Sequence, residues 1–204
     1  MSGGGISYAQ EIKRKAIHML SLTIPICYWF LTKMEAIYIL APITLIALIF
    51  DIGRHNNEAI NNFCNKFFGN ILREHEKGKG LSGATPLLLA ALLCIALFPK
   101  IIAISAIAIL VICDTAAALV GRKWGRIKFL GKSLEGTLAF IFSGIAVIYI
   151  IKTLANESQD FFIYGCLATI IAALLEVFSK KLHVDDNYSI PISFAVALWV
   201  FLYV

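Results

Sequence analysis

The chain has 204 residues, of which 59% are hydrophobic and 15% charged, and its mean hydropathy is +0.81. Soluble domains carry about a quarter charged residues, so this composition excludes an ordinary water-soluble protein and indicates a membrane protein. The net charge of +5 does not indicate a nucleic-acid partner, because the basic residues flank apolar blocks and no nucleic-acid-binding fold is visible.

Apolar residues fall in seven blocks of about 16–20 residues, which as helices match the thickness of a hydrocarbon core. Backbone amides inside lipid need partners within their own segment, so we expect each block to be a helix. In chain order the predicted spans are Ala16–Thr32, Glu35–Ile52, Leu81–Phe98, Ile101–Val120, Leu134–Ile151, Phe161–Ser179 and Ser189–Val204. The sequence therefore predicts an all-α, polytopic membrane bundle of about seven transmembrane helices that forms a single domain, residues 1–204.

Positive charge predicts the orientation of this bundle. With a cytoplasmic N-terminus, 15 of the 18 Lys and Arg residues fall in cytoplasmic segments, and only Lys33, Lys100 and Lys152 fall on the other side. Such a bias over short loops favours a cytoplasmic N-terminus and makes anionic lipid headgroups secondary partners. The sequence does not distinguish a bacterial inner membrane from the endoplasmic reticulum, and it leaves the oligomeric state open, a homo-oligomer included.

The connection at residues 53–80 is the exceptional loop. Its apolar residues recur at helical spacing and would form one stripe: Ile60, Phe63, Cys64, Phe67, Phe68, Ile71 and Leu72. This pattern predicts an amphipathic interfacial helix at the membrane surface. Packing of the same stripe on the bundle is an equally good interpretation.

The segment from Asp114 to Gly136 carries the strongest chemical signal. Asp114 lies within the fourth block, roughly 10 Å below its cytoplasmic end. An ionised carboxylate there costs at least about 2.5–3.5 kcal/mol unless a partner compensates, so we expect a function such as binding a divalent cation. Ala118, Gly121 and Gly125 lie on the same helical face, where small residues allow close approach of a helix or a ligand.

Basic and small residues follow this acid. They are Arg122, Lys123, Arg126, Lys128 and Lys132, then Ser133, Glu135 and Gly136 at the start of the fifth block. Cations beside a glycine-rich backbone and a helix N-terminus can hold phosphates. The segment is not a P-loop, because five residues separate Gly125 from Gly131 where a P-loop has four.

Three further clusters lie on the predicted cytoplasmic side. In the first, Arg14 and His18 share one helical face, while Glu11 and Lys15 are explained by an ordinary helix ion pair. The second is the stretch 81–85, Leu-Ser-Gly-Ala-Thr, for which close packing is a sufficient explanation.

The third cluster follows the sixth block and contains Asp185, Asp186 and Asn187. Such a sequence usually forms only a turn, but adjacent carboxylates can also bind Mg²⁺. We interpret the nearby Glu176 as the i, i+4 partner of Lys180, without a catalytic role.

The order of these motifs along the chain resembles that of the small CTP-dependent lipid kinases. The motifs are E-x-x-R-K-x-x-H, L-S-G-A-T, D-x-x-A-x-x-x-G-R-x-x-G with K-S-x-E-G, and D-D-N-x-x-x-P. That family includes dolichol kinase, phytol kinase and CTP-dependent diacylglycerol kinase, and it is more distantly similar to phosphatidate cytidylyltransferase. The resemblance implies transfer of the γ-phosphate of CTP to a lipid alcohol such as diacylglycerol, a polyprenol or phytol. It also implies that Asp114 is a metal-linked catalytic acid, that Arg14 and Lys15 are required, and that Gly121 belongs to the nucleotide region.

On this basis we expect Asp114, with Asp185 or Asp186, to hold Mg²⁺ or another divalent cation, while Arg14 and Lys15 help to neutralise the phosphates. The expected nucleotide-binding residues are Gly121, Arg122, Gly125, Lys132, Ser133 and Gly136. The general base stays open between Asp114, Glu135 and His18. The sequence does not separate CTP from ATP, nor does it fix the lipid alcohol.

Two other functions compete with a lipid kinase. A phosphatidate cytidylyltransferase would use a similar nucleotide site to make a CDP-lipid. A membrane transporter is the alternative of another class, and polar residues near its midplane would be expected. The intramembrane acids of this chain lie towards one end of their spans, which disfavours a path through the bundle.

Overall fold

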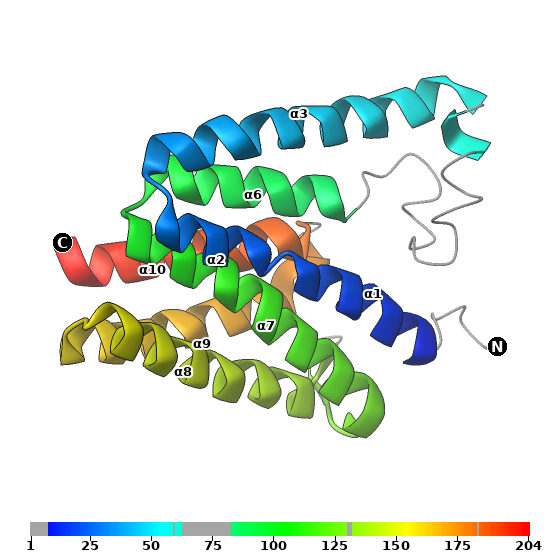
Figure 1. Cartoon of the computed structure of the whole chain (residues 1–204). Helices are drawn as coiled ribbons and strands as arrows, with labels where there is room; N and C mark the ends of the chain where they lie inside the picture. Colours follow the sequence, from blue (N-terminus) through cyan, green and yellow to red (C-terminus); the bar gives the residue numbers. More distant parts are fainter. Residues whose placement is uncertain (1–7, 59, 63–82, 130–131, 183) are drawn as a thin grey trace.

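The computed structural model describes residues 8–204 except 59, 63–82, 130–131 and 183 (Figure 1). Eight helices and one short strand pair make up the described chain. Their bounds are α1 Tyr8–Leu20, α2 Thr23–Phe30, α3 Lys33–Asn56, α6 Ala84–Leu97, α7 Lys100–Trp124, β1 Lys128–Phe129, β2 Lys132–Ser133, α8 Leu134–Ala155, α9 Gln159–Leu182 and α10 Asp186–Tyr203. Most of the predicted interfacial helix at 53–80 lies outside the described residues.

The helical bundle is confirmed, but the count of seven spans is not. Four described helices are long and apolar enough to cross a membrane, namely Lys33–Arg54, Lys100–Trp124, Leu134–Ala155 and Gln159–Ser179. The other three predicted spans are also helical, but none of them is among the four described helices that are long and apolar enough to cross a membrane. The apolar helix α6 has 14 residues, α10 opens with the polar pair Asp186 and Asn187, and the first block is broken between α1 and α2.

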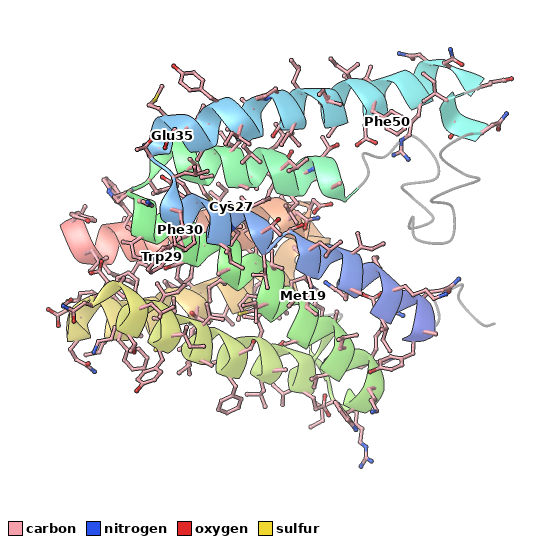
Figure 2. The ribbon with its side chains drawn as sticks, in the orientation of Figure 1. Met19, Cys27, Trp29, Phe30, Glu35 and Phe50 are labelled. Atoms are coloured by element: carbon pink, nitrogen blue, oxygen red, sulfur yellow. The ribbon has the colours of Figure 1, made fainter. Side chains whose placement is uncertain are left out.

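The break in the first predicted span has a local cause. Pro25 lies in the first turn of α2 and has no N–H to donate to the carbonyl of Ser21, so the series of helical hydrogen bonds is interrupted at this point. Ser21 and Leu22 instead donate to the carbonyls of His18 and Met19 in a tight turn, at 2.9 and 3.1 Å. As a result, α1 and α2 follow each other as separate helices over α7 (Figures 1 and 2).

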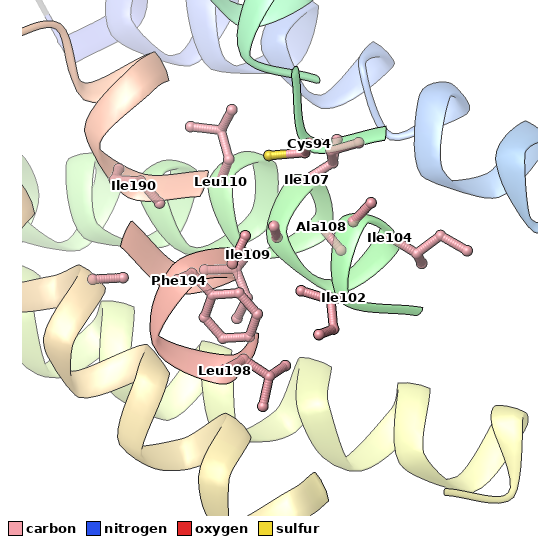
Figure 3. Packing of buried hydrophobic residues seen from close by; sticks show 14 of the residues in the cluster. Cys94, Ile102, Ile104, Ile107, Ala108, Ile109, Leu110, Ile190, Phe194 and Leu198 are labelled. Atoms are coloured by element: carbon pink, nitrogen blue, oxygen red, sulfur yellow. The ribbon is translucent and has the colours of Figure 1, made fainter. Parts of the chain in front are cut away.

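Helix α7 forms the centre of the bundle. In its most apolar stretch 78% of the residues are buried, compared with 22% in α3 and 28% in α8. It packs against α1, α2, α6, α8 and α10. Figure 3 shows buried side chains of α7 and α10 in this core, including Ile102, Ile109, Phe194 and Leu198. The outer helices expose large apolar side chains, Phe30 and Phe50 among them (Figure 2), which suits contact with lipid.

The two ends of the bundle differ in chemistry. The links α2–α3, α6–α7 and α8–α9 lie together at one end (Figure 1), and the charged residues in and beside these links are Lys33, Glu35, Lys100, Glu157 and Asp160. At the other end α7 finishes, the β1–β2 pair turns back antiparallel, α9 finishes and α10 begins. Helix α1 lies along this second end, so it brings its charged residues there.

Helices α8 and α9 pack closely at two glycines. A methyl group added at Gly144 would lie 2.3 Å from Cγ2 of Thr169, and one added at Gly165 would lie 2.6 Å from Cγ2 of Ile148. Both distances are far shorter than a normal carbon–carbon contact, so these positions need glycine to keep the helices together.

We therefore expect Gly144→Ala to lower the free energy of unfolding by about 1–3 kcal/mol through overpacking, measured by thermal unfolding of the purified protein in detergent. Thr169→Ser removes Cγ2 but keeps the hydroxyl that donates to the carbonyl of Gly165. The double variant Gly144→Ala/Thr169→Ser should recover most of the loss. A double variant as unstable as Gly144→Ala would show that the contact with Thr169 is not the cause.

Candidate active site

A cavity of about 490 Å³ opens at the polar end of the bundle. Residues of α1, α7, β1, β2, α8, α9 and α10 line it. Its charged lining consists of Glu11, Arg14, Asp114, Arg122, Lys128, Lys132, Glu176 and Asp186. Segments far apart in the sequence thus contribute charge of both signs to one concave site.

Three carboxylates meet in this cavity. Asp114 comes from α7, Glu176 from α9 and Asp186 from the first turn of α10, and one oxygen of each lies within 4.8 Å of the others. Asp114 is 8% exposed and Glu176 is 3% exposed. Oδ1 of Asp186 is buried and has no hydrogen-bond partner. Such an arrangement of oxygen donors is typical of a site for a hard divalent cation.

Two lysines compensate these acids. Lys15 of α1 donates to Oδ2 of Asp114, and Lys132 of β2 donates to Glu176 and, at 3.1 Å, to Oδ2 of Asp186. Burial by itself would lower the pKa of Lys132, but the negative charges of Glu176 and Asp186 outweigh it and raise that pKa. Lys132 therefore stays protonated while it bridges α9 and α10.

His18 approaches the same acid as Lys15. Its Nε2 is buried, has no hydrogen-bond partner, and lies 3.6 Å from Oδ2 of Asp114. Lys15 and His18 are three residues apart on α1, so both side chains face the same carboxylate of α7.

Two arginines and Glu11 form another part of the wall. Glu11, which is 1% exposed, accepts a hydrogen bond from Arg14, and its other oxygen lies 3.4 Å from Nη2 of Arg122. The local spacing predicts Glu11 as the partner of Lys15. In the structure Lys15 turns to Asp114 instead, because the buried carboxylate across the helix interface needs the charge.

The glycines near the cavity allow α7, β2 and α8 to come into contact. An added methyl group would lie 2.7 Å from Oγ of Ser133 at Gly121, 2.2 Å from the carbonyl oxygen of Gly121 at Gly125, and 2.8 Å from the carbonyl oxygen of Ala117 at Gly136. Ser133 caps α8 by accepting from the backbone N–H of Gly136 at 3.1 Å. All four residues predicted for nucleotide binding here line the cavity, and each also has a packing role.

Four predicted site residues are not among the lining residues: Lys15, His18, Glu135 and Asp185. Lys15 and His18 lie behind the lining, where both approach Asp114. Glu135 accepts from the backbone amides of Arg126 and Ile127, at 2.9 and 3.2 Å, and so closes the turn before α8. Asp185 is the N-cap of α10 and accepts from both the backbone and the side chain of Asn187 at 2.8 Å. Its neighbour Asp186 is the residue that joins the three-carboxylate cluster.

Glu176 is the residue that the sequence interpretation missed. The i, i+4 spacing favoured a local pair with Lys180, whose side chain lies outside the described residues, whereas Glu176 binds Lys132. The signal that could have found it is the one that singles out Asp114, since Glu176 is also a carboxylate within an apolar span.

The fold and the cavity define an integral membrane protein with a charged site at one end of its helical bundle. Within that class, the chain belongs to the same family as an uncharacterized protein of Rickettsia prowazekii, to which it is 35% identical over 95% of this chain and 96% of that protein.

Two more distant relatives cover nearly the whole chain. CTP-dependent diacylglycerol kinase 1 of Schizosaccharomyces pombe is 28% identical over 96% of this chain and 95% of that protein. An uncharacterized protein of Methanocaldococcus jannaschii is 28% identical over 89% of each chain. No family model and no solved structure matches the chain. The first of these two relatives supports, at a distance, the resemblance seen in the motifs.

The buried pair Lys15–Asp114 generates a stability prediction. Asp114→Asn leaves the ammonium of Lys15 buried without its counter-charge, and we expect a loss of about 3–5 kcal/mol, measured by thermal or denaturant unfolding in detergent. Lys15→Met/Asp114→Asn removes both charges and should return most of that stability. Wild-type stability of Asp114→Asn alone would contradict the assigned pairing.

Proposed function

We propose that this protein is a membrane lipid kinase that transfers the γ-phosphate of a nucleotide, CTP in the first instance, to the hydroxyl of a lipid alcohol. The observation that carries the proposal is the cluster of three carboxylates, which shares one cavity with several cations at one end of a membrane bundle. The similarity to a CTP-dependent diacylglycerol kinase along nearly the whole chain supports the choice of reaction and of nucleotide.

The carboxylates fit a magnesium ion in number and kind. Asp114, Glu176 and Asp186 would hold it, because their oxygens converge and Oδ1 of Asp186 is buried without a partner. When bound, the ion neutralises charge that develops on the transferring phosphoryl group. Lys15 and Lys132 would then be released from part of their charge compensation and become available to the phosphates.

The cations of the cavity would bind the polyphosphate. Arg14 and Arg122 present guanidinium groups, whose planar donors match phosphate oxygens, and Lys128 and Lys132 add compact charges. Gly121, Gly125 and Gly136 keep side chains out of the space beside these cations. A volume of about 490 Å³ lies in the range of small-molecule sites.

Phosphoryl transfer breaks the bond between the γ-phosphorus and its bridging oxygen and forms a bond to the oxygen of the lipid alcohol, whose proton must be accepted. Among the three predicted bases, we assign this step to the neighbouring pair Asp114 and His18. Glu135 is engaged by two backbone amides of the turn before α8, whereas Asp114 lines the cavity and His18 lies beside Asp114. His18 Nε2 has no hydrogen-bond partner and faces Asp114 at 3.6 Å.

The site lies towards the end of the bundle at which α7 finishes. Asp114 is six residues, about 9 Å along the helix, before Val120, after which Gly121, Arg122 and Lys123 follow, so an acceptor hydroxyl would approach it from that end. The bias of 15 out of 18 basic residues towards this side supports a cytoplasmic site, where nucleotides are available, and anionic lipids as neighbours. Diacylglycerol, polyprenols and phytol are the candidate acceptors.

The reaction is tested by incubating the purified protein in mixed micelles with γ-labelled CTP or ATP and each candidate lipid alcohol. We expect label in a lipid phosphate together with release of CDP. The double variant Lys15→Met/Asp114→Asn is expected to be nearly as stable as the wild type. Its activity should be at least about 100-fold lower, since it removes charges that act on the transferring group. Full activity in that variant would contradict the mechanism.

The same assay separates the competing functions by their products. A cytidylyltransferase would make a CDP-lipid and pyrophosphate from a lipid phosphate. A transporter would move solute into liposomes without nucleotide turnover. Either result in place of lipid phosphorylation would overturn the proposal.

Asp185 and Asp186 provide a matched test of the metal site. Asp186→Asn changes a member of the cluster, so we expect the Mg²⁺ concentration for half-maximal activity to rise about tenfold or more, and chelation of Mg²⁺ to abolish the activity of both proteins. Asp185→Asn keeps a good N-cap residue and should leave the Mg²⁺ requirement unchanged. An equal rise in both variants would contradict the assignment to Asp114, Glu176 and Asp186.

A further inference from the structure

Glu11 is a buried acid of the cavity wall that lies outside the three-carboxylate cluster. Its two oxygens face two different cations. Oε1 accepts from Nη2 of Arg14 one turn further along α1, and Oε2 lies 3.4 Å from Nη2 of Arg122 in the last turn of α7. One carboxylate therefore joins two guanidinium groups that come from helices far apart in the sequence.

The surroundings of Glu11 stabilise its ionised, negatively charged form. Burial disfavours its ionised form, but the hydrogen bond from Arg14 and the positive charges of Arg14 and Arg122 outweigh burial and lower the pKa of the carboxyl group. The carboxylate in turn separates two guanidinium groups that would otherwise repel each other across the same wall. Arg122 is 39% exposed at its side chain, so the contact with Glu11 restricts the rotamers of a long side chain that borders solvent.

We propose that Glu11 is a positioning residue, which holds Arg14 and Arg122 in the orientation that binds the nucleotide phosphates. The inference rests on the proposed function of the cavity. Glu11 does not contact phosphate in this account, because a carboxylate repels it. Its contribution is preorganisation: the arginines are fixed before the nucleotide arrives, so less conformational entropy is lost on binding.

The test compares Glu11→Gln with the wild type. The amide has nearly the shape of the carboxylate but no charge, so both guanidinium groups lose their ion pair with residue 11. We expect the KM for the nucleotide and the dissociation constant of a non-hydrolysable CTP analogue, measured by calorimetry, to rise about tenfold or more, with kcat changed by less than about threefold. Asp160→Asn, an exposed acid at the opposite end of the bundle, is the control and should change neither quantity.

A double-mutant cycle tests whether Glu11 acts through an arginine. If it does, Glu11→Gln should weaken nucleotide binding much less in an Arg122→Gln background than in the wild type, because the residue that it holds is gone. Glu11→Asp keeps the charge but shortens its reach, so it should give an intermediate dissociation constant. This variant also supplies the comparison if Glu11→Gln does not fold.

The outcomes separate this inference from the proposed function. A wild-type protein that binds no nucleotide would overturn both. A wild-type protein that binds the analogue, with unchanged affinity in Glu11→Gln and Glu11→Asp, would overturn only the role of Glu11. A fall in thermal stability with unchanged nucleotide affinity would likewise show that Glu11 only holds α1 against α7.

Discussion

Compensation of buried charge is the constraint on which the rest of this structure depends. Three carboxylates from α7, α9 and α10 converge at the polar end of an apolar bundle, where an uncompensated charge is strongly disfavoured. Lys15 brings α1 to α7, and Lys132 brings β2 to α9 and α10. The same ion pairs that make the acids tolerable therefore determine where the surrounding elements lie.

The glycines follow from that constraint. Lys132 reaches Glu176 and Asp186 from β2, whose Ser133 lies close against the end of α7 and the start of α8. Gly121, Gly125 and Gly136 allow this approach, since a methyl group at any of them would meet neighbouring atoms within 2.8 Å. The absence of bulk beside Asp114 thus serves the packing of the site and its open volume at the same time.

Sequence patterns predict what is local in this protein. Apolar blocks give the helices, and the cost of an acid in lipid singles out Asp114. The number of spans is not predictable in the same way, because Pro25 breaks an apolar block without changing its composition. The partners of Glu11 and Glu176 are also beyond local spacing: each acid has a lysine four residues later in the chain, but its contacts in the structure include residues more than 40 positions away. Which of several nearby cations an acid binds is decided by the packing of whole helices.

The choice of cation differs across the cavity, and this difference bears on function. The three convergent acids are compensated by lysines, whose compact ammonium groups sit on flexible stems and can exchange one oxygen partner for another. The outer wall instead carries Arg14 and Arg122, whose planar guanidinium groups are held by Glu11. Under the proposed function, a divalent cation would need charge compensation that can move away, whereas phosphates would need donors that stay fixed. Lysines beside the acids and arginines held by Glu11 would meet these two requirements in one cavity.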